Sequence, residues 1–449
     1  QAPGAQCLHR PQRLHPVRRR ALGGLGRRPV GLTGGPFGGG EMTLPQVVII
    51  GAGMTGSLLA MMVKDMGVSV RVVEKSKGAG GRMSTHRLRG DKGREGPVLG
   101  RADMGTQYIT TRTPEDHAIL GPLYGSLLSA GVLQPFHGQV NGPNPYGTAG
   151  PEVRHYTAPL GLQAVAEHFL KQSGAEVQWD AALRSLELQP EGGVSLELGS
   201  GSGGQEPVAL SSPEPLSVVV LTQPVQQVLG SSKFGLGGNF MQGLDPGLSA
   251  DLSKVEYSSR FAVAFYFDAS QFSWPHPWTA HYFDKGDVRY VSHDSGKRGA
   301  SEESMVSIVV HSGVPLGIEL KDDTAPYDAA AARLRADLEQ KLPEIPWAKA
   351  ASVKVQKWLY SQVYKGIGAK RPSPDWVWDA GDGGFPGCVE LFRTEGTLGL
   401  LAGDAMAPAS NFEGCVFSAF RAAEAVRAHL QRVGAGGGAA DGLQPKSDL

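Results

Sequence analysis

The sequence is short of cysteine and carries no net charge, and each of these features excludes a class of protein. Three cysteines in 449 residues (Cys7, Cys388 and Cys415) are too few for a disulfide framework and lack the spacing of a metal site. The first 40 residues hold seven arginines and no acid, which leaves 36 basic against 43 acidic residues elsewhere. This mildly acidic body argues against nucleic acid as the main partner. Few cysteines favour a reducing compartment, so we expect a cytoplasmic protein.

Glycine, by contrast, is abundant: the chain has 63, about twice the usual share of roughly 7%. The glycines follow no G-X-Y period, which excludes a collagen-like protein. Hydrophobic residues make up 41% of the sequence, enough to bury a sizeable core. A length of 449 residues predicts two or three domains.

The first 40 residues contain ten glycines and five prolines without an apolar period, so we expect residues 1–41 to be a disordered extension. Arginine without acid is typical of mitochondrial transit peptides, but the density of Gly and Pro disfavours an amphipathic helix. Met42 stands directly before the first predicted strand. An extension or an upstream start on a chain that works from Met42 is therefore the preferred interpretation. We also expect a flexible tail at 434–449.

Residues 42–63 contain no charged side chain, a length that would span a membrane. We predict instead a βαβ unit, with a strand at 47–50, a glycine-rich turn, a helix to about residue 66 and a strand at 69–73. A first strand that is apolar throughout is typical of parallel sheets, because helices cover both of their faces. The sequence therefore predicts no membrane span.

Apolar periodicity predicts two further groups of elements. The first group comprises a helix at 159–173, strands near 176–180, 183–188 and 194–198, a solvated loop at 199–215 and a buried strand at 218–221. The second comprises antiparallel strands at 255–268, 279–292 and 304–311 and a helix at 326–341. A buried strand at 398–401 and a long helix over 411–433 follow. The change of character near residue 255 indicates a second domain.

The turn after the first strand has the pattern G-x-G-x-x-G, formed by Gly51, Gly53 and Gly56. In a Rossmann-type unit these glycines permit the tight turn, the approach of a pyrophosphate and the packing of helix on strand. The phosphates lie on the helix N-terminus, whose N–H groups favour anions. Glu74 follows Gly51 by 23 residues, where an acid accepts hydrogen bonds from the adenosine ribose. The pattern predicts a dinucleotide site, and ligand-free glycine turns in a flavodoxin-like sheet are the less favoured alternative.

Segments beyond Glu74 decide between NAD and FAD. Three of them resemble signatures of the flavin amine oxidase superfamily: Gly80-Gly81-Arg82-Met83, Asp103-Met104-Gly105-Thr106-Gln107-Tyr108 and Leu400-Leu401-Ala402-Gly403-Asp404. The resemblance implies FAD, with Asp404 on the ribityl hydroxyls and the N-terminus of the following helix directed at the flavin. It also implies that Arg82 lies along the pyrophosphate, which its guanidinium suits in fork geometry.

Within that superfamily the chain resembles the renalases. The resemblance rests on VVIIGAGMTGSLLA, GGRMST, DMGTQYIT, YSSRFAVAFYF, VVHSGVPLG, VQKWLYSQV and GDAMAPASNFEGCVFSA, in that order between residues 47 and 419. It implies an α/β flavoprotein of two domains in a p-hydroxybenzoate-hydroxylase-like topology. We expect a Rossmann-type FAD-binding domain at 46–112, 157–254 and 396–433. We expect a substrate domain with a mainly antiparallel sheet at 113–156 and 255–395. Insertions near 199–215 and 366–395 depart from the family pattern.

The resemblance also implies cofactor contacts, at Thr55, Gly81, Arg82, Thr106 and Gln107. The FAD is expected to be non-covalent, because Cys415 lies in Asn-Phe-Glu-Gly-Cys and not in the Ser-Gly-Gly-Cys-like setting of covalent family members. A small buried helix residue is the preferred interpretation of Cys415.

On the substrate face of the flavin the resemblance places Tyr282, His311 and Trp358. The residues by themselves favour plainer interpretations, as a strand aromatic, an interior histidine and a core tryptophan. The resemblance reverses this for Tyr282 and Trp358 and leaves both interpretations open for His311. No metal site is expected, because the remaining histidines, such as His276, His281 and His293, are too scattered.

The implied activity is that of an FAD-dependent oxidase, which oxidises 2-dihydro and 6-dihydro isomers of NAD(P)H to NAD(P)+ and reduces O2 to hydrogen peroxide. Hydride loss from a dihydronicotinamide creates an aromatic pyridinium, so the protein needs to position the ring but needs no strong base. One alternative is a flavin amine oxidase acting on catecholamines or polyamines. Another is a signalling ligand with a structural flavin, secreted by a non-classical route since no signal peptide is predicted. The sequence predicts no oligomeric state.

Overall fold

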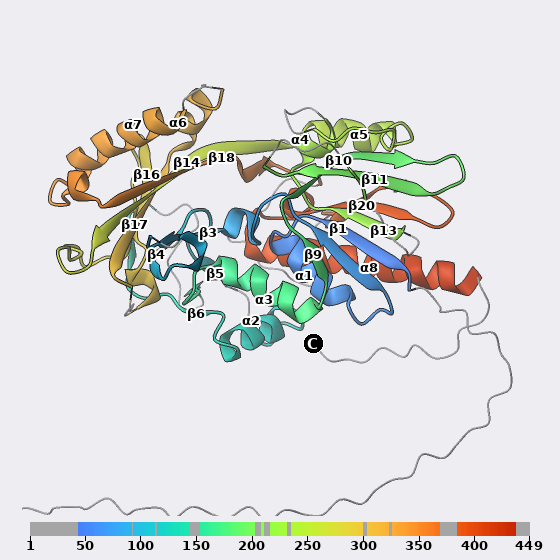
Figure 1. The fold of residues 1–449 in the computed structure, drawn as a ribbon, viewed down its shortest axis with the longest axis horizontal. Helices are drawn as coiled ribbons and strands as arrows, with labels where there is room; N and C mark the ends of the chain where they lie inside the picture. The colour runs from blue at the N-terminus through green and yellow to red at the C-terminus, as the bar shows by residue number, and fades with distance from the viewer. Residues whose placement is uncertain are drawn as a thin grey trace, which may run out of the picture. The chain divides into compact units, whose positions relative to one another are not determined.

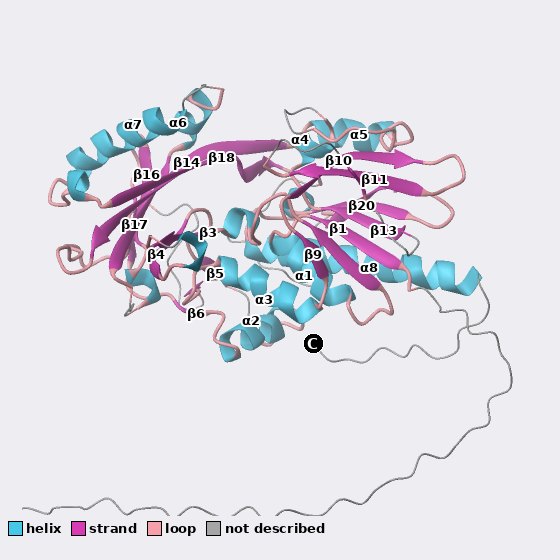
Figure 2. Cartoon of the chain, in the orientation of Figure 1, coloured by secondary structure: helices cyan, strands magenta, loops and turns pink. Residues whose placement is uncertain are grey.

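The computed structural model describes residues 44–91, 93–112, 115–143, 153–202, 208–210, 216–230, 235–299, 303–322, 326–368 and 384–436. The predicted extension at 1–41 lies outside these residues, as do residues 437–449 of the predicted tail. The described residues all belong to one compact unit. Figure 1 follows the chain through this unit from blue to red, and Figure 2 separates its helices from its strands.

The first sheet has, in the described residues, six strands in the order β19-β20-β13-β1-β2-β9. Their bounds are β1 (Gln46–Ile50), β2 (Ser69–Val73), β9 (Glu176–Gln178), β13 (Leu216–Leu221), β19 (Cys388–Arg393) and β20 (Leu398–Ala402). Neighbouring strands are parallel except for the pair β19 and β20. All five residues of β1 are buried, as expected of a parallel sheet covered on both faces. This sheet confirms the predicted Rossmann-type fold.

Helices cover one face of this sheet, and a small antiparallel sheet with two short helices covers the other (Figure 1). Val47 and Ile49 share a core with helices α1 (Met54–Val63), α3 (Gln163–Ser173) and α8 (Phe412–Gly436). Val48 and Ile50 point into the opposite core. The elements of that layer are β10 (Ala181–Leu188), β11 (Val194–Ser200), β12 (Val208–Ala209), α4 (Val225–Val228) and α5 (Pro246–Ser253). The alternation of side chains along β1 thus ties both layers to one strand.

The second sheet also has six strands among the described residues, in the order β18-β14-β17-β16-β15-β7. Their bounds are β7 (Val140–Asn141), β14 (Glu256–Asp268), β15 (Ala280–Tyr282), β16 (Val288–His293), β17 (Met305–Ser312) and β18 (Ser352–Lys365). The pairs are antiparallel except for β15 with β7. Helices α6 (Val314–Glu319) and α7 (Pro326–Lys341) follow β17, the second at the residues that the sequence predicts. The predicted mainly antiparallel sheet is therefore confirmed.

Strand β14 brings this sheet into contact with residues 102–104, which lie downstream of the glycine-rich turn. Phe261 and Phe265 pack on one side against Leu334 of α7. Residues of the opposite face of β14, such as Ala262, share a cluster with Ala102 and Met104 at the end of β4 (Val98–Asp103). Strand β4 forms a hairpin with β3 (Thr85–Arg89). The residues after β4 thus lie against the second sheet.

Several predicted boundaries need correction. Helix α3 begins at Gln163 and not at residue 159, because Gly161 takes a φ of +88° that a right-handed helix does not accommodate. The predicted strand at 279–292 is a hairpin of β15 and β16, turned at Gly286 with φ +88°. The predicted loop at 199–215 contains β12, and α8 continues three residues past 433 to Gly436.

Other elements were not predicted. These include α4, α5, α6, β7, β18, β19 and the β3–β4 hairpin, together with α2 (Leu120–Ser129), β5 (Ile109–Thr111), β6 (Gln134–Pro135) and β8 (Arg154–Thr157). Strand β18 lies at the edge of its sheet and carries Lys354, Lys357 and Lys365 among apolar residues. Charged residues are typical of edge strands, where they discourage pairing with another chain, and they obscure the alternation that identifies a strand.

The uncharged stretch at 42–63 is divided between β1 and α1, as predicted. Of the helices in the described part of the chain, none combines the length and the apolar character that crossing a membrane requires.

Candidate active site

The parallel strands of the first sheet end at a common edge, and the predicted nucleotide-binding residues follow them there. β1 pairs in parallel with both β2 and β13, and β13 with β20. Gly51, Glu74, Thr222 and Gly403 therefore lie directly beyond four neighbouring strand ends. In open α/β sheets, ligands bind outside the carboxyl ends of the strands.

The glycine turn has the geometry that its sequence predicts. Gly51 takes a φ of +110°, and a Cβ there would lie 2.5 Å from Thr222 Oγ1. A Cβ on Gly56 would lie 2.0 Å from the Gly51 carbonyl oxygen, so the helix approaches the turn only because this residue is glycine. A Cβ on Gly53, by contrast, would enter open space. The N-terminus of α1 has no side-chain cap and no acid in its first turn, as suits a helix that binds a phosphate.

Glu74 is buried beside this turn. Its Oε2 accepts a hydrogen bond of 2.7 Å from the Ala52 N–H, and its Oε1 accepts one of 2.8 Å from the Ser76 N–H. The carboxylate thus ties the end of β2 to the glycine turn. It occupies the position from which an acid reaches a ribose in Rossmann-type sites.

One downstream motif lies against the glycine turn, and a second lies against the first. The Gly80 N–H donates to the Ala52 carbonyl at 2.9 Å, and a Cβ on Gly81 would lie 3.4 Å from Gly53 Cα. Arg82 is in the following turn, and its carbonyl accepts a 2.9 Å hydrogen bond from the Thr106 N–H. Motifs separated by more than 20 residues therefore form one continuous surface.

Arg82 and Asp404 bind each other. Arg82 Nη1 donates to Asp404 Oδ2 at 2.8 Å, and Nη2 donates to Oδ1 at 2.6 Å, in a bidentate pair. The Asp404 side chain is 5% exposed and that of Arg82 35%. Asp404 also accepts a hydrogen bond from Ser410. The resemblance implies different partners, the pyrophosphate for Arg82 and the ribityl chain for Asp404. The pair uses two of the five N–H donors of the guanidinium.

The substrate-face tryptophan stands over the segment that follows β4. Trp358 Nε1 donates a 2.7 Å hydrogen bond to the Met104 carbonyl. A Cβ on Gly105 would meet the Trp358 ring at 3.3 Å and the Arg82 carbonyl at 1.9 Å. Gly105 is therefore enclosed between the two, and Trp358 is held within contact of the predicted cofactor-binding segment.

The other two predicted substrate-face residues join the same segment through side chains. The Gln107 amide nitrogen lies 3.2 Å from His311 Nε2. The His311 ring is 5.6 Å from that of Tyr290, which in turn is 4.8 Å from Tyr282. The Tyr282 hydroxyl lies 2.9 Å from the Tyr108 hydroxyl. The structure thus gathers these residues into one aromatic cluster, of which the sequence predicted Tyr282 and His311 but missed Tyr108 and Tyr290.

Burial governs the protonation of His311. Burial and the positive charges of Arg260 and Lys297 lower the pKa of His311 to about 3, against 6.5 for a free histidine. The imidazole is therefore neutral at physiological pH. It is too weak a base to hold a proton removed from a substrate.

A buried group of charges beneath Gln107 was not predicted. Lys297 is fully buried and lies 2.9 Å from Asp103 Oδ2 and 2.5 Å from Asp294 Oδ1. Arg298 Nη1 lies 2.5 Å from Asp294 Oδ2. In the sequence three of these residues stand in a short polar segment, Asp294-Ser295-Gly296-Lys297-Arg298, whose composition is typical of exposed loops. No sequence signal distinguishes it from one.

The three scattered histidines come together in space. His276 stacks on Trp278 with ring centres 4.4 Å apart, Trp278 is 5.1 Å from His281, and Trp274 stacks on His293 at 5.2 Å. These histidines are scattered in the sequence, but in the folded protein they lie near one another. They form an aromatic stack, and among the described residues no group of three or more side chains of His, Cys, Asp and Glu is arranged to hold a metal.

Cys415 lies in α8 as predicted but is half-buried, and not fully buried. Its thiol contacts the Thr55 hydroxyl, and burial raises its pKa to about 12. Such a thiol stays protonated and unreactive at neutral pH.

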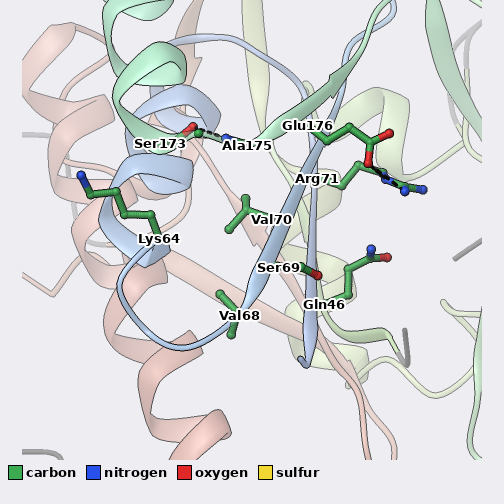
Figure 3. A pocket seen from close by; sticks show the side chains of 10 residues that line it. Gln46, Lys64, Val68, Ser69, Val70, Arg71, Ser173, Ala175 and Glu176 are labelled. Atoms are coloured by element: carbon green, nitrogen blue, oxygen red, sulfur yellow. Dashed lines mark hydrogen bonds and ion pairs between the residues drawn. The ribbon is translucent and has the colours of Figure 1, made fainter. Parts of the chain in front are cut away.

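A pocket lies at the opposite edge of the first sheet from the predicted nucleotide-binding residues. It lies at the amino ends of β1, β2 and β9, where Arg71 and Glu176 form an ion pair at 2.9 Å (Figure 3). Lys64 Nζ donates to the backbone carbonyl of Gln172 at 3.3 Å. Ligands of open α/β sheets bind at the carboxyl edge.

We expect Glu74→Ala to weaken FAD binding by about 1–3 kcal/mol, because the ribose loses an acceptor and the glycine turn loses its tie to β2. The measurement is the Kd of FAD titrated into the apoprotein. Glu74→Gln, which keeps one acceptor oxygen, should lie between wild type and alanine. Glu176→Ala, at the other end of the strands, serves as the control. Equal Kd values for Glu74→Ala and wild type would show that Glu74 does not contribute to FAD binding.

Comparison with known families agrees with this geometry. The sequence model of NAD(P)-binding Rossmann-like domains matches residues 49–120, and that of flavin containing amine oxidoreductases matches residues 136–427. Renalase from Mus musculus is 26% identical over 396 residues, which cover 86% of this chain and 100% of the mouse protein.

Solved structures support the fold. A putative protoporphyrinogen oxidase from Exiguobacterium sp. 255-15 superposes with a TM-score of 0.56 at 13% identity, over 86% of this chain and 99% of its own. Cyclohexylamine oxidase from Brevibacterium oxydans IH-35A superposes with a TM-score of 0.55 at 15% identity, over 87% of this chain and 100% of its own. At these identities the likeness concerns the fold alone.

Proposed function

Because this chain belongs to the flavin containing amine oxidoreductases and is an FAD-dependent oxidase, we propose that it oxidises the 2-dihydro and 6-dihydro isomers of NAD(P)H. The products are NAD(P)+ and, from O2, hydrogen peroxide. The proposal rests on the resemblance to the renalases and on the chemistry of the residues around His311.

We assign the FAD to the carboxyl edge of the first sheet, non-covalently bound. The open space at Gly53 and the uncapped N-terminus of α1 fit a pyrophosphate, and the buried carboxylate of Glu74 fits the adenosine ribose. Arg82, Asp404, Thr106 and Gln107 are then the contacts of the flavin half. In this assignment the first sheet is the core of the FAD-binding domain, and the second sheet that of the substrate domain.

The observation that carries the substrate assignment is the group of aromatic side chains around the neutral imidazole of His311. Tyr282 and Trp358 offer flat apolar surface to a nicotinamide ring, and the buried Tyr290 packs against Tyr282 with ring centres 4.8 Å apart. The acid whose charge acts on His311 is Asp294, and it is already bound to Lys297 and Arg298. The arrangement suits a neutral dihydronicotinamide ring, whose oxidation requires no base.

The amine alternative requires different groups. An alkylamine is a cation at neutral pH and must lose a proton before it is oxidised. His311, with a pKa of about 3, is too acidic in its protonated form to keep that proton. A dihydronicotinamide becomes a pyridinium on losing hydride, without any deprotonation.

When bound, the FAD supplies the acceptor of the hydride and transfers the electrons to O2. The side chains orient the substrate. We assign Trp358 and Tyr282 to the faces of the ring, since an error of about 1 Å in such positioning costs on the order of a hundredfold in rate.

The test is anaerobic mixing of the purified holoprotein with three classes of reductant: the dihydronicotinamide isomers, polyamines and catecholamines. We expect the visible flavin band to bleach with the isomers alone, and air to restore it with one hydrogen peroxide per NAD(P)+ formed. Bleaching by an amine and not by the isomers would transfer the assignment to the amine oxidase alternative. Bleaching by none of them would favour a structural flavin in a signalling ligand.

A further inference from the structure

The side-chain amide of Gln107 is fixed in one orientation. Its nitrogen donates to the Asp103 carbonyl and, at 3.1 Å, to the Gly105 carbonyl. Its oxygen accepts a 3.4 Å hydrogen bond from the Ser292 hydroxyl. Turning the amide over would place its oxygen against the carbonyl oxygens of Asp103 and Gly105. Neither of these can donate a hydrogen bond, so the reversed orientation is unfavourable.

This orientation determines what His311 presents to Gln107. The amide nitrogen has two N–H groups for three contacts, namely the Asp103 carbonyl, the Gly105 carbonyl and His311 Nε2 at 3.2 Å, so one N–H has to serve two of them. An amide nitrogen accepts no hydrogen bond, so an Nε2 that bonds to it has to be the acceptor. A neutral imidazole with an acceptor at Nε2 carries its proton on Nδ1. The backbone of Met104 is a second hydrogen-bonding partner of the His311 ring, and this contact opposes the lowering of its pKa. A protonated ring would have an N–H at both nitrogens. Its Nε2–H would then face the N–H groups of the Gln107 amide, and two donors repel each other.

Lys297 holds the backbone of Gln107 by a hydrogen bond to its carbonyl oxygen. The Lys297 ammonium has three N–H groups and three oxygen partners: it donates to the Gln107 carbonyl at 2.7 Å and contacts one carboxylate oxygen each of Asp103 and Asp294. Asp103 Oδ1 in turn accepts hydrogen bonds from Thr85 Oγ1 at 2.6 Å and from the Leu162 N–H at 2.9 Å.

Charge within this group is balanced. Burial would raise the pKa of Asp294, but the charges of Lys297 and Arg298 outweigh it and keep the pKa below its ordinary value. Asp294 therefore stays ionised beside the two cations. We name the residues Asp103, Asp294, Lys297 and Arg298 the buried ion cluster.

We propose that Gln107, anchored by the buried ion cluster, is a positioning residue that holds His311 in its neutral form with the proton on Nδ1. His311 then serves as a polar, uncharged wall of the site and not as a general base. This deepens the proposed function, on which its catalytic consequence rests, because a substrate that becomes a pyridinium gains positive charge and a neutral ring does not repel it.

The charged and titratable groups around His311 agree with this. Arg260 on β14 and Lys297 after β16 disfavour a second positive charge, and Asp294 favours one but is bound by its own cations. Tyr290, on the neighbouring strand β16, is buried, and burial and the charge of Tyr282 raise its pKa, so it is neutral.

The test reads the imidazole directly in the full-length holoprotein. Histidine labelled with 15N gives ring-nitrogen NMR shifts that distinguish the Nδ1–H, Nε2–H and doubly protonated forms, and the spectrum of His311→Asn identifies the signals of His311. We expect the Nδ1–H form, unchanged between pH 5 and pH 8. An ordinary histidine would titrate near pH 6.5.

Two variants change the contact between Gln107 and His311, one by inverting it and one by removing it. Gln107→Glu replaces the donor by an acceptor, so His311 should protonate with a midpoint at least about one pH unit higher than in wild type. The rate of flavin reduction should then fall on the acid side of that midpoint. Gln107→Met removes the donor at equal length and should release the ring into a mixture of tautomers. The exposed Gln172→Met, on α3, is the matched control and should change neither readout.

The outcomes separate this inference from the proposed function, because the NMR readout needs no substrate. A wild-type His311 that carries its proton on Nε2, or that titrates near pH 6.5, would overturn the inference even if the isomers are oxidised. Where Gln107→Glu does not fold, Gln107→Met and the wild-type tautomer still decide. An Nδ1–H form that persists unchanged in Gln107→Met would show that Gln107 does not position the ring.

Discussion

Ordinary 4-dihydro NADH is expected to reduce the flavin of this protein at least about a hundredfold more slowly than the 2-dihydro and 6-dihydro isomers. A site that holds the nicotinamide ring for hydride loss from one edge directs the C4 hydride away from the acceptor. Misplacement of about 1 Å costs on the order of a hundredfold in rate. The measurement is the rate constant of flavin bleaching in an anaerobic stopped-flow experiment, run at saturating reductant.

The Trp358→Ala variant tests where this selectivity originates. Trp358 donates to the Met104 carbonyl at 2.7 Å and lies beside Gly105 of the predicted cofactor-binding segment. We expect the variant to retain its FAD and to reduce it more slowly with the isomers, so that the gap to NADH narrows. Equal rates for NADH and the isomers in the wild-type protein would refute the positional argument.

Replacing Asp404 by alanine is expected to destabilise the apoprotein by about 3 kcal/mol, the lower end of the range for breaking a buried ion pair. The lower end applies because the Arg82 side chain keeps 35% of its exposure and can regain some water, whereas Asp404 is 5% exposed. The variant should also bind FAD poorly, since it loses the acid at the flavin half of the site. Urea unfolding without FAD separates the first effect from the second, because a bound ligand adds its own stabilisation.

The control for Asp404→Ala is Glu339→Ala on α7. Glu339 Oε1 accepts a 2.9 Å hydrogen bond from Arg335 one helical turn away, and both side chains are about half exposed. Removing such a pair typically changes stability by less than about 1 kcal/mol. An Asp404→Ala protein that unfolds at the same urea concentration as Glu339→Ala, with full FAD occupancy, would show that the Arg82–Asp404 pair supports neither the fold nor the cofactor.

Much of the fold was predictable because its signals are local. The apolar strand at 47–50, the glycine spacing that follows it and Glu74 at the end of the next strand each depend on residues close in sequence. The helix at 326–341 was predicted at its observed bounds for the same reason. Strand β18 was missed. It lies at a sheet edge, and lysines interrupt its apolar residues, so the sequence shows no regular alternation of apolar and polar side chains.

Among the site residues, the sequence by itself determined the glycine turn, the acid after β2 and, through resemblance, the residue types on the flavin side. Backbone requirements explain this: a positive φ at Gly51 and the 2.0 Å approach at Gly56 admit glycine alone. The tertiary structure decided which side chains meet. Arg82 and Asp404 are 322 residues apart in sequence and pair in space, and Lys297 reaches the Gln107 carbonyl across 190 residues. A lysine in a polar turn is usually solvated, and it becomes a buried anchor only when the fold places three oxygen atoms around its ammonium and removes the water.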